Sequence, residues 1–183
     1  EVHAAMVRLN RLVVEALLAA GVPAVGLAPS ALAVCANGRI SHIHTATVQA
    51  ALAAGLVPVI FGDVAFDAAQ GGTIISTEEV MIALADDLRP SWLLLAGGGA
   101  GGVDAPGGGG AALTRRKYDG VGPAPGRGRG TDVTGGMVSK VQSMLRLVAA
   151  QPHLSIRIFS GLEAGLLTAL WLGPETAVGT RIA

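Results

Sequence analysis

The most informative stretch of this sequence is Thr131-Asp132-Val133-Thr134-Gly135-Gly136-Met137-Val138-Ser139-Lys140. It reads as a glycine turn that opens into a helix, and apolar residues at helical spacing continue that helix to about Ala150. Paired glycines let the backbone approach a ligand closely, and the first free N–H groups of a helix carry partial positive charge. Lys140 lies about one turn into the helix and can reach back to a bound phosphate. The stretch therefore predicts a cradle for a nucleotide phosphate, with an ordinary capped helix and a surface lysine as the alternative.

Helical patterns alternate with short apolar strands on both sides of this stretch. The predicted helices cover 2–20, 45–54, 77–88 and 162–172, the predicted strands cover 23–27, 56–61, 73–75, 91–96, 154–159 and 178–182, and a hairpin turn lies at Asn37-Gly38. This alternation is typical of an α/β fold in which helices cover a parallel sheet. We therefore expect a three-layer αβα sandwich with a mainly parallel sheet.

Composition limits the classes of function that the chain can have. The chain has 183 residues, which favours one domain, and a formal net charge of zero, which argues against a nucleic-acid or anionic-membrane partner. Its hydrophobic fraction is 51 % and is mostly aliphatic, as expected for a buried sheet. Cys35 is the single cysteine, so we expect a buried structural thiol and a reducing cytoplasm.

Several polar residues are site candidates on their local sequence pattern alone. Asp63 follows a predicted strand, where it is either a turn residue or a ligand-binding residue. His42 and His44 point to one side of a predicted strand, but no acidic residue lies nearby to complete a metal site, so we favour surface positions. We expect His3 and Arg157 to face solvent.

Four stretches, taken in order, carry a resemblance to a known family. They are Arg8-Leu9-Asn10; Gly62-Asp63-Val64 followed by Gly72-Thr73-Ile74-Ile75-Ser76; Asp132-Val133-Thr134-Gly135-Gly136-Met137 with Lys140; and Phe159-Ser160-Gly161 with Gly179-Thr180-Arg181-Ile182. In this order the chain resembles the amino acid kinase superfamily, and in particular its isopentenyl phosphate kinase branch. The resemblance covers most of the chain except about residues 97–130.

The resemblance implies an amino acid kinase-like fold and a cytoplasmic enzyme of isoprenoid biosynthesis that transfers a phosphoryl group from ATP, with Mg²⁺, to isopentenyl phosphate. A homodimer is also implied. The implied roles are catalysis by Lys140 and Glu78, ATP binding by Asp132, Thr134, Gly135, Gly136, Met137 and Lys140, and substrate binding by Gly62, Asp63, Ser76 and Thr77. No side chain of the chain is implied as a metal ligand.

The chain also departs from the family pattern. Thr77 and Glu78 stand where the family tends to have Gly and Asp, and Gly98 and Ala100 stand where its acidic nucleotide motif would fall. The family's Lys-x-Gly-Gly segment and its glycine-rich loop with a histidine are not found in this sequence. We therefore expect a single, N-terminally truncated kinase domain, the C-terminal two-thirds or so of the family fold, with a flexible glycine-rich segment at about 97–130 and little activity alone. The alternatives are a non-catalytic fragment and a related kinase that acts on a carbamate, acyl or uridylate acceptor.

Overall fold

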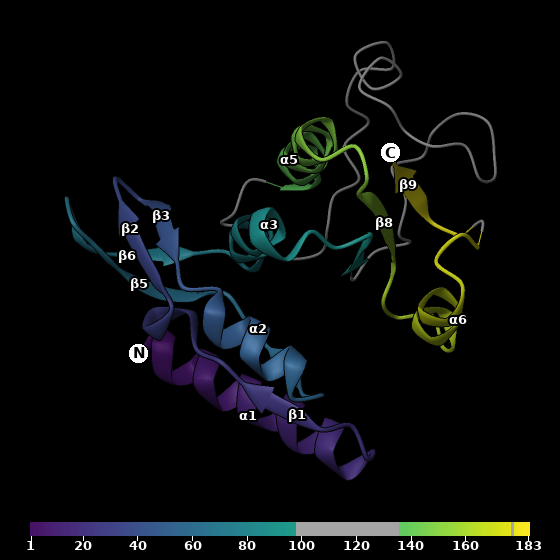
Figure 1. Ribbon diagram of the computed structural model, residues 1–183, viewed down its shortest axis with the longest axis horizontal. Coiled ribbons are helices and arrows are strands. Elements are labelled where there is room, and N and C mark those ends of the chain that lie inside the picture. The colour runs from purple at the N-terminus through teal and green to yellow at the C-terminus, as the bar shows by residue number, and fades with distance from the viewer. Residues whose placement is uncertain (98–135, 177) are drawn as a thin grey trace. The chain divides into compact units, whose positions relative to one another are not determined.

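The computed structural model describes residues 1–97, 136–176 and 178–183 (Figure 1). The chain forms two compact units, Glu1–Arg89 and Pro90–Ala183, and each is described by itself. The predicted α/β class is confirmed. The described strands form sheets of two, four and three strands, and the pairings are three parallel and three antiparallel, where we expected a mainly parallel sheet.

The first unit contains the elements expected from its sequence and one strand that was not expected. Its helices are α1 (Val2–Ala19), the 3-10 turn η1 (Pro29–Ala31), α2 (Ala46–Ala53) and α3 (Thr77–Leu88), and its strands are β1 (Ala24–Gly26), β2 (Ala33–Ala36), β3 (Arg39–Ile43), β4 (Val57–Val59), β5 (Asp63–Asp67) and β6 (Gly71–Ile75). β1 pairs with β4 in parallel, and the larger sheet has the order β3-β2-β5-β6. Asn37 and Gly38, with φ of 54° and 77°, form the predicted hairpin turn between β2 and β3.

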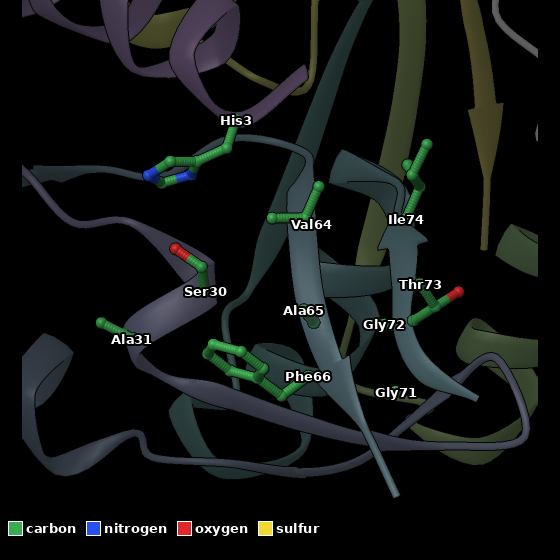
Figure 2. A pocket seen from close by; sticks show the side chains of 10 residues that line it. All are labelled: His3, Ser30, Ala31, Val64, Ala65, Phe66, Gly71, Gly72, Thr73 and Ile74. Atoms are coloured by element: carbon green, nitrogen blue, oxygen red, sulfur yellow. The ribbon is translucent and has the colours of Figure 1, made fainter. Parts of the chain in front are cut away.

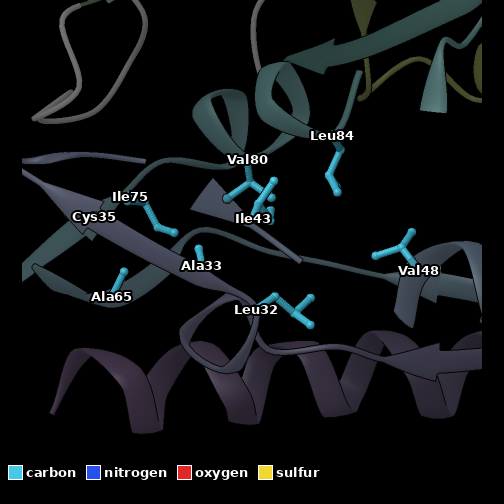
Figure 3. Close-up of a cluster of buried hydrophobic side chains, with 9 residues drawn as sticks. All are labelled: Leu32, Ala33, Cys35, Ile43, Val48, Ala65, Ile75, Val80 and Leu84. Atoms are coloured by element: carbon cyan, nitrogen blue, oxygen red, sulfur yellow. The ribbon is translucent and has the colours of Figure 1, made fainter. Parts of the chain in front are cut away.

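The core of the first unit lies between the larger sheet and the helices α2 and α3 (Figure 3). Its buried members are Leu32, Ala33, Cys35, Ile43, Val48, Ala65, Ile75, Val80 and Leu84. Cys35 is fully buried. Burial, together with the nearby acids Glu79 and Asp67, raises the pKa of its thiol, so the thiol stays protonated and the expected structural role is confirmed.

β5 is the strand that the sequence did not predict. Asp63 is the first residue of this strand rather than a turn residue, and it is completely buried, while its predicted role in substrate binding stays a prediction. The strand alternates, with Asp63, Ala65 and Asp67 buried and Val64 and Phe66 more exposed. Two of the three buried positions are aspartates, which are rarely buried. The sequence therefore lacks the apolar alternation by which a half-buried strand is recognised.

Asp67 holds the two turns at one end of the larger sheet together. Its Oδ2 accepts a hydrogen bond of 2.7 Å from the amide of Gly38, and its Oδ1 accepts bonds of 2.8 and 3.0 Å from the amides of Ala69 and Gln70. The bond from Gly38 is the first cause of a lowered pKa for this carboxyl. The β2–β3 turn and the β5–β6 turn therefore share one anionic acceptor.

The second unit is a smaller sheet with helices on its faces. Its elements are β7 (Trp92–Gly97), α5 (Gly136–Ala150), β8 (Ser155–Ser160), α6 (Leu166–Leu172) and β9 (Thr180–Ile182). β8 pairs in parallel with β7 and antiparallel with β9. Leu166 and Leu170 of α6 pack against Phe159 of β8, while α5 contacts β8 and β9. Within the described ranges, no helix is long and apolar enough to cross a membrane.

α6 begins four residues later than the predicted helix at 162–172. Gly165, with φ of 80°, occupies the N-cap position in a left-handed conformation, and the residues before it form turns. Such a conformation suits glycine and interrupts a helix.

Arg157 was expected to face solvent, and this prediction was wrong. The residue is only 2 % exposed, its Nε and one terminal nitrogen donate to the carbonyls of Pro174 and Val178, and its guanidinium lies 5.7 Å from the ring centroid of Trp92. Burial, and then the nearby Arg181, lower the pKa of this guanidinium. Arg157 does alternate with Ile156 and Ile158, but both faces of β8 are buried. The alternation therefore does not place Arg157 on a solvent-exposed face.

The first prediction concerns the loss of stability at low pH. Asp67→Asn keeps the size of the side chain and removes its charge. Because the folded-state pKa is lowered, the charged carboxylate stabilises the fold above the ordinary Asp range, near about pH 4, and this stabilisation is lost as the pH falls toward the lowered pKa. We expect the variant to melt at a lower temperature at pH 7 and to lose less stability between pH 4 and pH 2 than the wild type.

Circular dichroism melts of both proteins across that pH range are the measurement. Asp86→Asn, which changes an exposed acid on α3, is the matched control. If the melting temperatures of the wild type and Asp67→Asn fell equally between pH 4 and pH 2, the stabilising role of the Asp67 carboxylate would be contradicted.

Candidate active site

In the first unit, Gly62 contacts Thr77 and so joins the β4–β5 connection to the start of α3. The amide of Gly62, between β4 and β5, donates a hydrogen bond of 2.9 Å to Oγ1 of Thr77, the first residue of α3. A Cβ on Gly62 would lie 3.0 Å from the amide nitrogen of Thr77 and 3.1 Å from the carbonyl oxygen of Ile75. These are backbone atoms, so a side chain at this position would force the backbone of Thr77 or Ile75 to shift. The structure therefore brings together Gly62, Ser76 and Thr77, which were predicted to bind substrate; we call this contact the β4–α3 junction.

The N-terminus of α3 is capped and acidic. Ser76 is the N-cap residue, and its Oγ accepts a hydrogen bond of 3.1 Å from the amide of Glu79. Oε1 of Glu79 accepts a bond of 3.1 Å from the amide of Ile40 on β3, so this acid holds the β2–β3 hairpin. Glu78, the predicted catalytic acid, is half-buried in the same turn, one residue from Thr77.

His3 and Asp63 form a pair that the sequence did not suggest. Nδ1 of His3 lies 3.0 Å from both carboxylate oxygens of Asp63. The carboxylate is fully buried, while the His3 side chain is 47 % exposed, so the expectation that His3 is simply solvated was wrong. The reason is a contact across 60 positions of sequence, which fixes the start of α1 against the start of β5. No local pattern reports such a pairing.

A mostly apolar pocket of about 640 Å³ lies beside this pair (Figure 2). Its lining is His3, Ser30, Ala31, Val64, Ala65, Phe66, Gly71, Gly72, Thr73 and Ile74. Phe66 and Ile74 are 73 % and 63 % exposed, so large apolar side chains stand open on this wall. The sequence reasoning missed the pocket; the alternation of Val64 and Phe66 along β5 was the available signal.

The predicted nucleotide residues belong to the second unit or lie outside the described residues. Asp132, Thr134 and Gly135 lie outside them, and for Gly136 and Met137 the structure describes the helical backbone of α5. Lys140 lies on α5, near its start, and is half-buried. The helix predicted after the glycine turn is therefore confirmed from Gly136 to Ala150.

A magnesium site built from side chains does not follow from this geometry. In the part of the chain that the structure describes, no group of three or more His, Cys, Asp or Glu residues is placed to hold a metal ion. His42 and His44 are exposed on and beside β3. Mg²⁺ in phosphoryl-transfer sites keeps several waters and takes its other oxygens mainly from substrate phosphates.

Comparison with known proteins gives a consistent result. The profile described as the Amino acid kinase family matches residues 1–160. The chain is 33 % identical over 181 residues to an isopentenyl phosphate kinase of Methanothermobacter thermautotrophicus, and 38 % identical over 149 residues to one of Haloferax volcanii. These alignments cover 96 % and 81 % of this chain.

Solved structures agree with the sequence comparison. One X-ray structure of an isopentenyl phosphate kinase matches with a TM-score of 0.65 and 29 % identity, covering 96 % of this chain and 66 % of that chain. A substrate complex of an isopentenyl phosphate kinase, at 19 % identity and a TM-score of 0.65, supports the fold alone. The chain spans 66 % and 59 % of the lengths of the Methanothermobacter and Haloferax relatives.

The second prediction tests the β4–α3 junction. Gly62→Ala places a methyl group against the backbone of Thr77 and Ile75, and either the Gly62–Thr77 hydrogen bond or the start of α3 must shift. We expect a loss of about 1–3 kcal/mol in the free energy of unfolding, as for other overpacked sites. Urea denaturation followed by circular dichroism measures it.

Gly72→Ala is the matched control, because its Cβ would meet only the carbonyl oxygen of Ala65, at 3.8 Å. Equal stabilities of Gly62→Ala and Gly72→Ala would show that the junction is not tightly packed.

Proposed function

The chain belongs to the amino acid kinase family, and on this basis we propose that it is the larger part of an enzyme that transfers the γ-phosphoryl group of ATP to isopentenyl phosphate, giving isopentenyl diphosphate. The relatives of which it spans about two-thirds are named isopentenyl phosphate kinases. In this proposal the first unit binds the phosphoacceptor and the second unit binds the nucleotide.

The observation that carries the proposal is the apolar pocket in the first unit. An isopentenyl group has no polar atom, so its site must be an apolar surface of small volume. Val64, Phe66 and Ile74 offer such a surface. Val64 of the pocket follows Asp63 on β5, and Ile74 precedes Ile75 on β6, so the pocket begins near the same end of these paired strands as the β4–α3 junction. In the proposal the junction receives the phosphate.

Thr77 gives the junction a hydrogen-bond donor where the family tends to have glycine. Its Oγ1 accepts the amide of Gly62, and a hydroxyl that accepts one bond still has its own proton to donate. In the proposal that proton goes to the acceptor phosphate. The added bulk of Thr77 is thereby offset by a new polar contact.

Lys140 and Glu78 are the proposed catalytic residues. Phosphoryl transfer needs little covalent help from protein, so positioning and charge neutralisation dominate. Lys140 would neutralise charge on the β- or transferring phosphate, and Glu78 would be the catalytic acid of the first unit. Asp132, Thr134, Gly135, Gly136 and Met137 would form the remainder of the nucleotide cradle. Mg²⁺ would enter with ATP, held by the nucleotide phosphates.

The proposal includes a cytoplasmic location and a homodimer. Cys35 is a buried, free thiol, which suits a reducing compartment. α1 has no fully buried residue and exposes Leu9 at 55 % and Leu12 at 63 %, an apolar face that a second copy of the chain could cover.

The direct test is ADP release with isopentenyl phosphate as acceptor, run on this chain and on the full-length product of its gene. Carbamate, acetate and uridylate are the competing acceptors. A preference for one of these would support a related kinase instead. Absence of both turnover and nucleotide binding in the full-length product would support a non-catalytic kinase fold.

The third prediction concerns Lys140. Lys140→Ala removes the proposed cation at the transferring phosphate, and we expect kcat to fall by about 100-fold or more with a smaller change in KM, as when a preorganised transition-state contact is lost. Lys140→Arg keeps the charge and should recover part of the rate. Steady-state ADP release measures both.

Arg146→Ala, on the exposed side of the same helix, is the control for damage to α5. A kcat for Lys140→Ala within a factor of about three of the wild type would remove Lys140 from the catalytic role.

A further inference from the structure

The two parallel strands of the second unit end at the same edge of their sheet. β7 and β8 pair in register, so that Gly97 lies opposite Ser160 at the last pair. The amide of Gly161 donates a hydrogen bond of 2.8 Å to the carbonyl of Gly97, which continues the pairing just past β8. Open α/β sheets bind their ligands outside the carboxyl ends of parallel strands. Ser160, the last residue of β8, therefore lies at the edge where a ligand is expected.

α5 begins at this same edge. The helix ends at Ala150, and the chain enters β8 at Ser155, whose amide donates a hydrogen bond of 2.9 Å to the carbonyl of Ser91, just before β7. The end of α5 therefore lies near the starts of both strands. A helix of 15 residues is about 22 Å long and a strand of six is about 20 Å long, so a crossover helix that returns along the sheet spans it from edge to edge. The first turns of α5 thus lie where β7 and β8 end.

Ser160 lies on the face of β8 that α5 covers. Phe159, the residue before it, packs against Leu166 and Leu170 of α6. Because side chains alternate along a strand, Ser160 belongs to the opposite face. α5 contacts β8 and lies across the sheet from α6 (Figure 1). Ser160 is therefore the last side chain of β8 on the face beneath α5.

Lys140 lies on the side of α5 that faces the sheet. It precedes Met144 by four residues, so the two side chains share one side of the helix. Met144 is only 1 % exposed, and Lys140 is half-buried. The amine of Lys140 and the hydroxyl of Ser160 thus belong to the same end of the layer between α5 and the sheet.

Ser160 also has a hydrogen to donate. Its Oγ accepts a hydrogen bond of 3.3 Å from the amide of Leu162, and a hydroxyl that accepts one bond keeps its own proton for another acceptor. The five residues that follow Ser160 are exposed up to Gly165, so a ligand can approach the hydroxyl from the edge of the sheet.

We propose that Ser160 is a phosphate-binding residue of the nucleotide site, with its hydroxyl donating to the phosphate that Lys140 neutralises; this rests on the function proposed above. A lysine ammonium is a point charge on a flexible stem and fixes the direction of a phosphate poorly. A hydroxyl at the end of a paired strand is held by the sheet and gives a directional bond. Ser160 thereby favours nucleotides that carry a β- or γ-phosphate over AMP, which lacks both.

Isothermal titration of the 183-residue chain with MgATP and with AMP tests this. The quantity measured is the ratio of the two dissociation constants, because a loss of folded protein affects both ligands alike. We expect Ser160→Ala to weaken ATP by about tenfold or more and AMP by less than about twofold, as for a lost hydrogen bond to a charged group. Ser160→Thr keeps the hydroxyl and should hold the ratio within about twofold of the wild type.

Ser155→Ala is the matched control. It makes the same chemical change at the opposite end of β8, where Oγ of Ser155 accepts a hydrogen bond of 3.1 Å from Arg181. Its ratio should equal that of the wild type, because this hydroxyl lies at the edge away from the start of α5.

The outcomes separate the two proposals. A preference for ATP that is lost in Ser160→Ala and kept in Ser160→Thr and Ser155→Ala supports the inference. An unchanged preference in Ser160→Ala, or equal losses in the alanine and threonine variants, overturns it and leaves the proposed function standing. A wild-type chain that does not bind ATP overturns the proposed nucleotide site of this chain, and the inference with it.

Discussion

A buried carboxylate must be paired, and two of them stand at the ends of β5. Asp63 at the start of the strand is paired with His3 on α1, and Asp67 at its end accepts amides from both neighbouring turns. Each acid has an obligatory partner on another segment, so the strand fixes the position of α1 at one end and of the β2–β3 hairpin at the other. The arrangement of the first unit depends on these two pairings.

The same strand also builds the candidate site. Alternation along β5 sends the acids and Ala65 inward, while Val64 and Phe66 stand on the pocket wall. The residue before the strand, Gly62, approaches the start of α3 so closely that an added Cβ would lie 3.0 Å from the amide nitrogen of Thr77. One short segment thus supplies an apolar surface, the close contact with α3 at Gly62 and the carboxylate that pairs with His3. An amphiphilic acceptor is the ligand class that suits this combination.

The second unit buries a cation, the guanidinium of Arg157, which also needs partners. Arg157 is buried without a carboxylate partner among the described residues, and it is satisfied instead by two carbonyls and by the face of Trp92. The carbonyls belong to Pro174 and Val178, in the connection between α6 and β9. The guanidinium therefore fixes the path of the chain into β9, and so the edge of the sheet on which α5 packs.

Local patterns were sufficient for most elements. The apolar spacing of α1, α3 and α5 and the Asn37-Gly38 turn depend on residues close together in the chain, and such short-range preferences can be recognised in sequence. The family was recognisable for a related reason, since its motifs are short and occur in order. The α/β class followed from the alternation of these elements.

Long-range pairing decided what the sequence could not indicate. His3 and Asp63 are 60 residues apart, and no local pattern around either residue indicates that they pair. Arg157 alternates with isoleucines as a solvent-facing residue would, and it is buried because α6 and its following connection cover that face. Whether a polar side chain is buried depends on which distant segment can satisfy it, and only the folded chain brings that segment into contact.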